Sequence, residues 1–64
     1  MPMTGKEMIR HLKKNGFQKK KGGKGGHQKM YNPNTDRTTE VPMHSKELGK
    51  GIEREILTQA GLIN

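Results

Sequence analysis

The 64-residue sequence has no cysteine and no tryptophan, one phenylalanine, one tyrosine and no long apolar run. Without cysteine it has neither a disulfide framework nor a thiolate metal site, which fits a reducing compartment. Without an apolar run of about 18 residues, we expect no membrane span and no signal peptide. Only 27% of the residues are hydrophobic. We therefore expect one small cytoplasmic domain over residues 1–64, with a core too small to enclose a deep active site.

Acidic residues are also scarce, and the basic residues that outnumber them are unevenly placed. The chain has 13 lysines and arginines against six acidic residues, for a net charge of +7. Residues 1–24 hold eight basic residues and one acidic residue, whereas residues 25–64 hold five of each. This asymmetry favours a polyanionic partner, either nucleic acid or an acidic protein. The alternative is a lysine-rich surface that only keeps a small protein soluble.

Helical patterns lie near the two ends of the chain. A capping box at Thr4 and Glu7 begins an apolar stripe that stops before Gly16, which predicts a helix over residues 4–15. A second stripe predicts a helix from residue 51 that ends at Gly61. The apolar residues of this second stripe are Ile52, Ile56, Leu57 and Ala60.

Three short strands are predicted between the helices. Residues 17–21 and 27–31 flank a glycine-rich segment, residues 22–26, which we interpret as a mobile hairpin loop. Residues 38–41 favour a third strand by their β-propensity, and Pro42 closes it. The order α-β-β-β-α predicts an α+β fold in which both helices pack on one face of a three-stranded antiparallel sheet.

His27 is the residue that the pattern indicates for chemistry, because it begins a strand beside the flexible loop and between two lysines. A neutral imidazole can take a proton from a ribose 2′-hydroxyl, and lysines can stabilise the charge of a pentavalent phosphate. The predicted phosphate-binding residues are Lys19, Lys20, Lys21, Lys24 and Lys29. The alternative, that His27 is only a solvated polar residue at a strand edge, stays open.

No metal or cofactor site is readable from the sequence. The other histidines, His11 and His44, have no acidic residue at ligand spacing, and no H-E-x-x-H pattern occurs. We interpret His11 as a boundary residue of the first helix and His44 as a local hydrogen-bonding residue before a short helical turn over residues 46–48. Met8, Met30 and Met43 are expected to fill the core.

Five segments carry a family resemblance that covers almost the whole chain: residues 4–9, 12–17, 24–27, 41–48 and 51–62. They resemble the HicA toxins, small mRNA interferases of bacterial and phage toxin–antitoxin systems. The resemblance implies a fold like the double-stranded-RNA-binding domain and RNA cleavage centred on the histidine of a Gly-Ser-His motif, which maps onto His27. Gly26 stands where that motif has serine, and Gln28 stands where many relatives have a second histidine. The matching Val-Pro-x-His segment makes His44 a candidate for a secondary, substrate-contacting role.

The resulting hypothesis is a metal-independent endoribonuclease toxin that needs no cofactor and cleaves mRNA by transesterification. The resemblance implies that a HicB antitoxin inhibits it, and we expect this partner to present an acidic surface to the lysines. The alternative is a non-catalytic RNA-binding module that has lost nuclease activity. Direct DNA binding is disfavoured, because no helix combines basic residues with base-reading residues in a recognition pattern.

Overall fold

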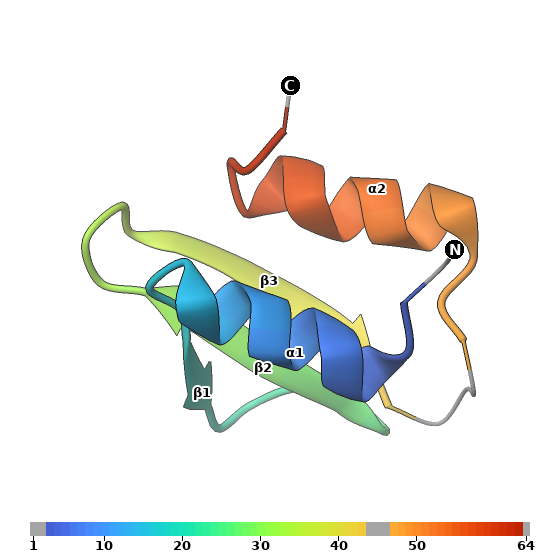
Figure 1. Ribbon diagram of the computed structural model, residues 1–64. Coiled ribbons are helices and arrows are strands. Elements are labelled where there is room, and N and C mark those ends of the chain that lie inside the picture. Colours follow the sequence, from blue (N-terminus) through green and yellow to red (C-terminus); the bar gives the residue numbers. More distant parts are fainter. Residues whose placement is uncertain (1–2, 44–46, 64) are drawn as a thin grey trace.

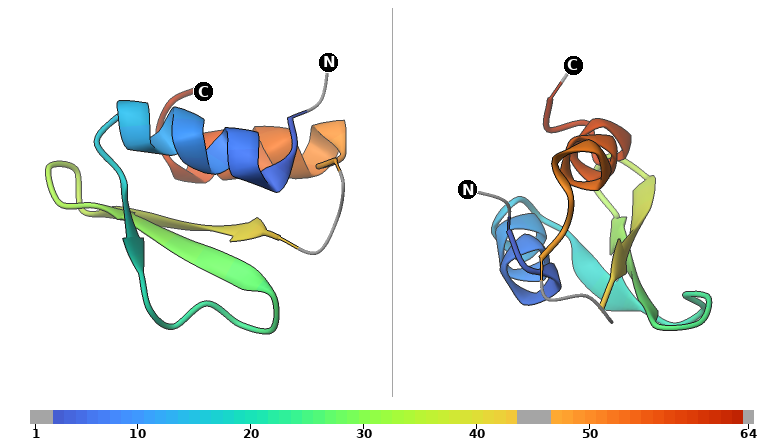
Figure 2. Two further views of the ribbon diagram at one scale, coloured as in Figure 1. Left: turned by 60° about the horizontal axis from the view of Figure 1, so that its bottom comes forward. Right: turned by 90° about the vertical axis from the view of Figure 1, so that its right-hand side faces the viewer.

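Two helices and three strands make up the computed structural model, which describes residues 3–43 and 47–63 (Figure 1). Their order is α1 (Gly5–Lys14), β1 (Gln18–Lys20), β2 (His27–Asn32), β3 (Arg37–Pro42) and α2 (Lys50–Gln59). The strands form one antiparallel sheet in the order β1-β2-β3. Both helices lie on one side of the sheet, and the loop between β1 and β2 extends away from them (Figure 2). The predicted α+β fold is therefore confirmed.

Helix α1 begins and ends where the sequence predicts, because both of its ends are capped. The Thr4 side chain accepts a hydrogen bond from the Glu7 backbone N–H, and the Glu7 carboxylate accepts one from the Thr4 N–H. At the other end Gly16 has a φ of 93°, which glycine adopts without strain. The N–H groups of Gly16 and Phe17 then bond back to the carbonyls of the last helical turn.

Strand β1 is shorter than predicted, and the reason is the end of α1. The Phe17 N–H donates to the Leu12 carbonyl at 3.0 Å, so Phe17 belongs to the helix-terminating turn and not to the strand. Its ring is buried and fills the core next to α1. The three residues of β1 that remain, Gln18–Lys20, are all exposed.

The core lies between the two helices and the sheet face that they cover. It draws on α1, β2, β3 and α2, and its buried residues are Met8, Ile9, Leu12, Phe17, Met30, Val41, Leu48, Ile56 and Ala60. Two core predictions are wrong: Met43 is 39% exposed and Ile52 is 46% exposed. Met43 follows the last residue of β3, and Ile52 lies in the first turn of α2, where it lines an open hollow between α2 and β3.

Helix α2 is tied to the edge strand β3 and to the N-terminal segment. The Thr39 hydroxyl donates to the Gln59 side-chain oxygen at 2.8 Å, and the Glu53 carboxylate accepts from the Met3 N–H at 2.7 Å. Within the predicted helical turn over residues 46–48, Glu47 and Leu48 are not helical; residue 46, like His44, lies outside the described residues. Neither helix is long and apolar enough to cross a bilayer, as far as the described residues show.

Candidate active site

His27 is the first residue of β2 and lies on the sheet face opposite the helices. Strand alternation separates it from Met30, which is buried under the helices, and places it on the same face as Lys29. The His27 side chain is 37% exposed. The imidazole therefore reaches solvent.

A tight turn over Lys24–His27 sets the position of the imidazole. The Lys24 carbonyl accepts a hydrogen bond from the His27 N–H at 2.8 Å, and the two central glycines have φ values of 25° and 77°. Positive φ at both central positions favours glycine, which explains Gly25 and Gly26 here. The Gly26 carbonyl also accepts from the Met43 N–H at 2.9 Å, so the turn continues the β2–β3 ladder.

The glycine-rich loop packs against β2 at one point. A Cβ atom added to Gly23 would collide with the carbonyl oxygen of His27 and approach the Lys29 N–H to 3.1 Å. Only glycine permits this close approach of two backbone segments. Residue 23 thus fixes how the loop leaves the sheet beside His27.

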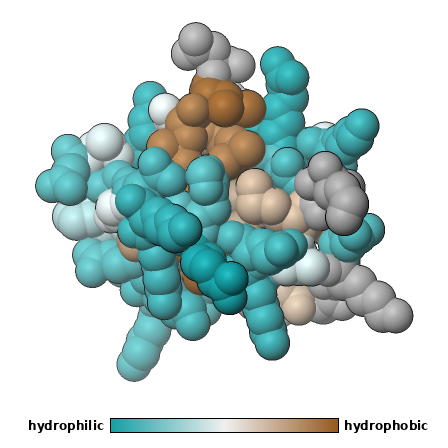
Figure 3. All heavy atoms as spheres, in the orientation of Figure 1, coloured by the Kyte–Doolittle hydropathy of each residue, from teal (hydrophilic) through white to brown (hydrophobic). Residues whose placement is uncertain are grey.

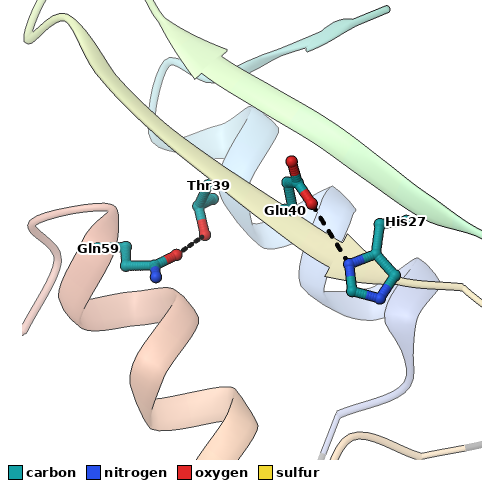
Figure 4. Close-up of polar contacts among 4 residues, drawn as sticks. All are labelled: His27, Thr39, Glu40 and Gln59. Carbon is teal, nitrogen blue, oxygen red and sulfur yellow. Dashed lines mark hydrogen bonds and ion pairs between the residues drawn. The ribbon is translucent and has the colours of Figure 1, made fainter. Parts of the chain in front are cut away.

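Glu40 is the partner of His27 that the sequence did not reveal. The His27 Nδ1 lies 3.4 Å from the Glu40 Oε1, and the second ring nitrogen points away from the carboxylate (Figure 4). Glu40 is paired directly with Lys29, and His27 with Pro42, so His27 and Glu40 are diagonal neighbours on one face. A carboxylate beside Nδ1 can hold the imidazole ring in one orientation.

The predicted lysines gather on the other side of His27. An open hollow of about 440 Å³, a volume in the range of small-ligand pockets, lies between the end of β1 and the start of β2. It is lined by Lys19, Lys20, Lys21, Gly22, Gly23, His27 and Gln28. None of these lysines pairs with a carboxylate among the described residues. The imidazole therefore borders a cationic surface.

Three of the predicted lysines occupy different positions around His27: Lys20, Lys24 and Lys29. Lys20 is paired with Lys29 across β1 and β2, on the same face as His27. The Lys20 ammonium also lies 5.0 Å from the centre of the Tyr31 ring, a cation–π contact. Lys24 is exposed in the loop, where its carbonyl holds the turn. The structure thus brings two lysines to the face of His27 and keeps a third in the adjoining loop.

Lys19 points to the other side of the sheet. It is paired with Met30, whose side chain is buried under the helices, so alternation directs Lys19 towards α1. It lines the hollow beside His27 and also a groove against α1. All three consecutive lysines thus line the hollow beside His27, and Lys19 also lines the groove against α1.

A second hollow borders His27 on the side of α2. It lies between β3 and α2, and it is lined by His27, Thr38, Thr39, Glu40, Pro42, Ile52, Glu55, Ile56 and Gln59. Its two carboxylates, Glu40 and Glu55, give it a charge opposite to that of the lysine hollow. His27 thus lies at a boundary between an acidic and a basic surface.

Titratable groups other than His27 include the two remaining histidines and Tyr31. His11 is half-buried on α1, and His44 is outside the described residues. No group of three or more metal-ligating side chains occurs among the residues that the structure describes. At the far end of β2 the Tyr31 hydroxyl donates to the Asp36 carboxylate at 2.8 Å, and this bond raises the pKa of Tyr31 above its ordinary value.

Comparisons with known proteins agree with this architecture. The family model described as the HicA toxin of bacterial toxin–antitoxin systems matches residues 5–62. The chain belongs to the HicA toxin family. A solved chain of a toxin–antitoxin complex from Streptococcus pneumoniae is 44% identical to this one, and the match covers 95% of this chain and 100% of that chain. The TM-score between the two is 0.81. A search of curated proteins finds no significant match.

Proposed function

We propose that this HicA-family chain is an endoribonuclease that cleaves mRNA at a site centred on His27. The observation that carries the proposal is the placement of a half-exposed imidazole between the Glu40 carboxylate and a lysine-lined hollow. An RNA phosphodiester is attracted by the lysines, and RNA supplies its own nucleophile in the 2′-hydroxyl. A small open surface can therefore cleave it.

The proposed reaction is a transesterification within the RNA. The Nε2 of His27 takes the proton of the ribose 2′-hydroxyl, whose oxygen attacks the neighbouring phosphorus. The bond from phosphorus to the 5′-oxygen breaks, and that oxygen takes up a proton from water and leaves as a 5′-hydroxyl, while His27 later returns its proton to solvent. The other product carries a 2′,3′-cyclic phosphate. Glu40 stabilises the imidazolium while His27 holds the proton, as a carboxylate does for a catalytic histidine.

The lysines are proposed to act on the phosphate charge. Lys29 lies next to the imidazole on the same face and Lys24 lies in the adjoining loop, so these two would stabilise the pentavalent phosphate. Lys20 and Lys21 would hold the neighbouring phosphates, and Lys19 would contact the backbone farther from His27. His44 stays a candidate for a secondary contact.

The experiment that tests the function compares RNA cleavage by the parent chain with cleavage by His27→Ala. We expect about a 10²–10⁴-fold loss of rate, the usual contribution of one acid–base group. Glu40→Gln should cause a smaller loss, because the neutral amide can still hold the ring but no longer stabilises the imidazolium. His11→Ala is the matched control, since it removes a histidine outside the site and should cleave like the parent.

The ends of the cleaved RNA test the chemistry. Mass spectrometry should find 2′,3′-cyclic phosphates and 5′-hydroxyls, a 2′-O-methyl group at the cleavage site should block the reaction, and EDTA should leave the rate unchanged. Products with 5′-phosphates would contradict the proposed route. If parent and His27→Ala bind RNA equally and neither cleaves it, the chain is a non-catalytic RNA-binding module. The replacement of the motif's serine by Gly26, and of a frequent second histidine by Gln28, favours this alternative.

We further propose an antitoxin partner of the HicB type with an acidic surface. The support is the similarity to a chain of a solved toxin–antitoxin complex, together with the lysines of the hollow beside His27, which pair with no carboxylate in the described part of the chain. Attraction between opposite charges is screened by salt, so the affinity should fall as the salt concentration rises. Calorimetric titration of the partner at increasing salt measures this, and a salt-independent affinity would contradict it.

A further inference from the structure

A cationic groove, separate from the lysine-lined hollow beside His27, runs along α1 on the other side of the sheet. It lies between α1 and β1 and is lined by Lys6, Ile9, Arg10, Lys13, Lys19 and Met43. Four of these six residues are cations, and none is acidic. The face of the molecule that carries α1 is mostly hydrophilic (Figure 3). Three of these cations, Lys6, Arg10 and Lys13, have no role in the proposed cleavage reaction.

The cations converge because of helix and strand periodicity. Lys6, Arg10 and Lys13 follow one another at intervals of four and three residues, which places them in one row along α1. Lys19 joins them from β1, since alternation turns it towards the helix. Adjacent charges in such a row are separated by roughly one helical turn, about 5.4 Å along the axis. A row of regularly spaced cations suits a polymer with regularly spaced anions.

No carboxylate neutralises this row among the described residues. Glu7 is the only acidic residue of α1, and its carboxylate accepts the Thr4 N–H at 2.9 Å within the capping box. The ion pair between His27 and Glu40 lies on the opposite face of the sheet and involves none of these cations. The groove therefore keeps its full positive charge for a partner.

The groove and the hollow beside His27 are joined through one residue. Lys19 lines both of them, and β1, which separates them, is only three residues long and fully exposed. A flexible single strand can pass around so short an edge. We propose that the α1 groove binds the phosphodiester backbone of the same RNA strand that is cleaved at His27, several nucleotides from the cleaved bond; this rests on the proposed nuclease function.

RNA fits the groove better than an acidic protein segment does. The groove continues into the proposed cleavage site, so a strand held at His27 reaches it without any further interface. Its lining has no aromatic residue and two apolar ones, Ile9, which is 6% exposed, and Met43, which is 39% exposed. Protein interfaces, in contrast, bury a core of apolar and aromatic residues.

The test measures binding of a non-cleavable 2′-O-methyl RNA by fluorescence anisotropy between about 50 and 200 mM salt. The variant Lys6→Ala/Arg10→Ala/Lys13→Ala should bind an oligonucleotide of about twelve residues at least roughly tenfold more weakly than the parent. Its slope of log affinity against log salt should be smaller by about two, since each phosphate contact to a single strand contributes about 0.7. An oligonucleotide of about four residues, held at His27 alone, should bind the variant and the parent alike.

The matched control is Lys14→Ala/Lys50→Ala/Arg54→Ala, which removes three exposed helical cations that do not line the groove. Equal losses in control and variant would overturn the proposal, because only net charge would then matter. Unchanged RNA binding together with weaker binding of a polyglutamate peptide would also overturn it and assign the groove to an acidic protein. The binding assay uses RNA that cannot be cleaved, so it tests the groove independently of nuclease activity. If the protein binds this RNA as expected but cleaves no natural RNA, the nuclease proposal is refuted and the binding role of the groove stands.

Discussion

The two faces of the sheet in this small protein are built from the same strands and have opposite properties. On the covered face, Met30 and Val41 are fully buried and belong to a core that includes residues of both helices. On the open face, His27 and Glu40 each keep 37% of their side-chain surface exposed. The alternation of side chains along β2 and β3 produces this division, since each successive residue changes face.

The contrast explains how a chain of 64 residues can hold both a core and a reactive surface. Both helices are placed on one face, where they cover the apolar residues, and none remains to cover the other. The open face therefore contributes little burial and is free to carry charge. Stability and the proposed chemistry are separated across one sheet, so substitutions should affect one without the other.

The largest expected effect that tests this separation comes from the covered face. Met30→Ala should lower the free energy of unfolding by about 2–5 kcal/mol, because it leaves a cavity under both helices. A domain of this size has a total stability of only about 3–10 kcal/mol, so a large part of the population would unfold. Urea unfolding followed by circular dichroism measures the change.

The neighbour of Met30 on the open face is the matched comparison. Lys29→Ala should change the free energy of unfolding by no more than about 0.5 kcal/mol while slowing RNA cleavage. Met30→Leu, which keeps the volume, should lose less than about 1.5 kcal/mol. If Lys29→Ala destabilised the fold as much as Met30→Ala, the division of the sheet into two roles would be wrong.

The smallest expected effect lies at the end of the open face, where Tyr31 donates to Asp36. The pKa of Tyr31 is raised above 10.0, first by this hydrogen bond to the carboxylate. The stabilisation from the bond is thus present below pH 10 and is lost as the pH rises through the raised pKa. Asp36→Asn should bring the pKa of Tyr31 back towards 10.0.

Ultraviolet absorbance of the phenolate follows this titration without ambiguity, since the chain has one tyrosine and no tryptophan. Asparagine tolerates the positive φ of 58° at residue 36, so the turn should persist in the variant. An unchanged titration would show that the carboxylate does not act on the phenol in solution.

Much of the fold could be predicted from local signals. The capping box and Gly16 set α1 to within a residue, because both act over one helical turn. The strand over residues 27–31 is confirmed as His27–Asn32, and the buried Met30 follows from alternation. The exposed Ile52 was missed because a helical stripe shows which residues share a face and not where the partner surface stops.

The site was predicted less completely, since part of it depends on strand register. His27 was identified from its own neighbours, whereas Glu40 contacts it only because His27 pairs with Pro42. That register is fixed by the turn between β2 and β3, in which Asp36 adopts a positive φ. The local sequence does not show which residue of the turn takes this conformation. Assignment of Lys19 to the α1 side likewise required its pairing with Met30.

The short strand β1 has a consequence for the behaviour of the protein at high concentration. An exposed sheet edge offers unpaired backbone groups to other chains, and natural proteins protect such edges with short strands and lysines. Two of the three residues of β1 are lysines. The side chains proposed to attract RNA thereby also oppose self-association, and replacing Lys19 and Lys20 with apolar residues should promote aggregation.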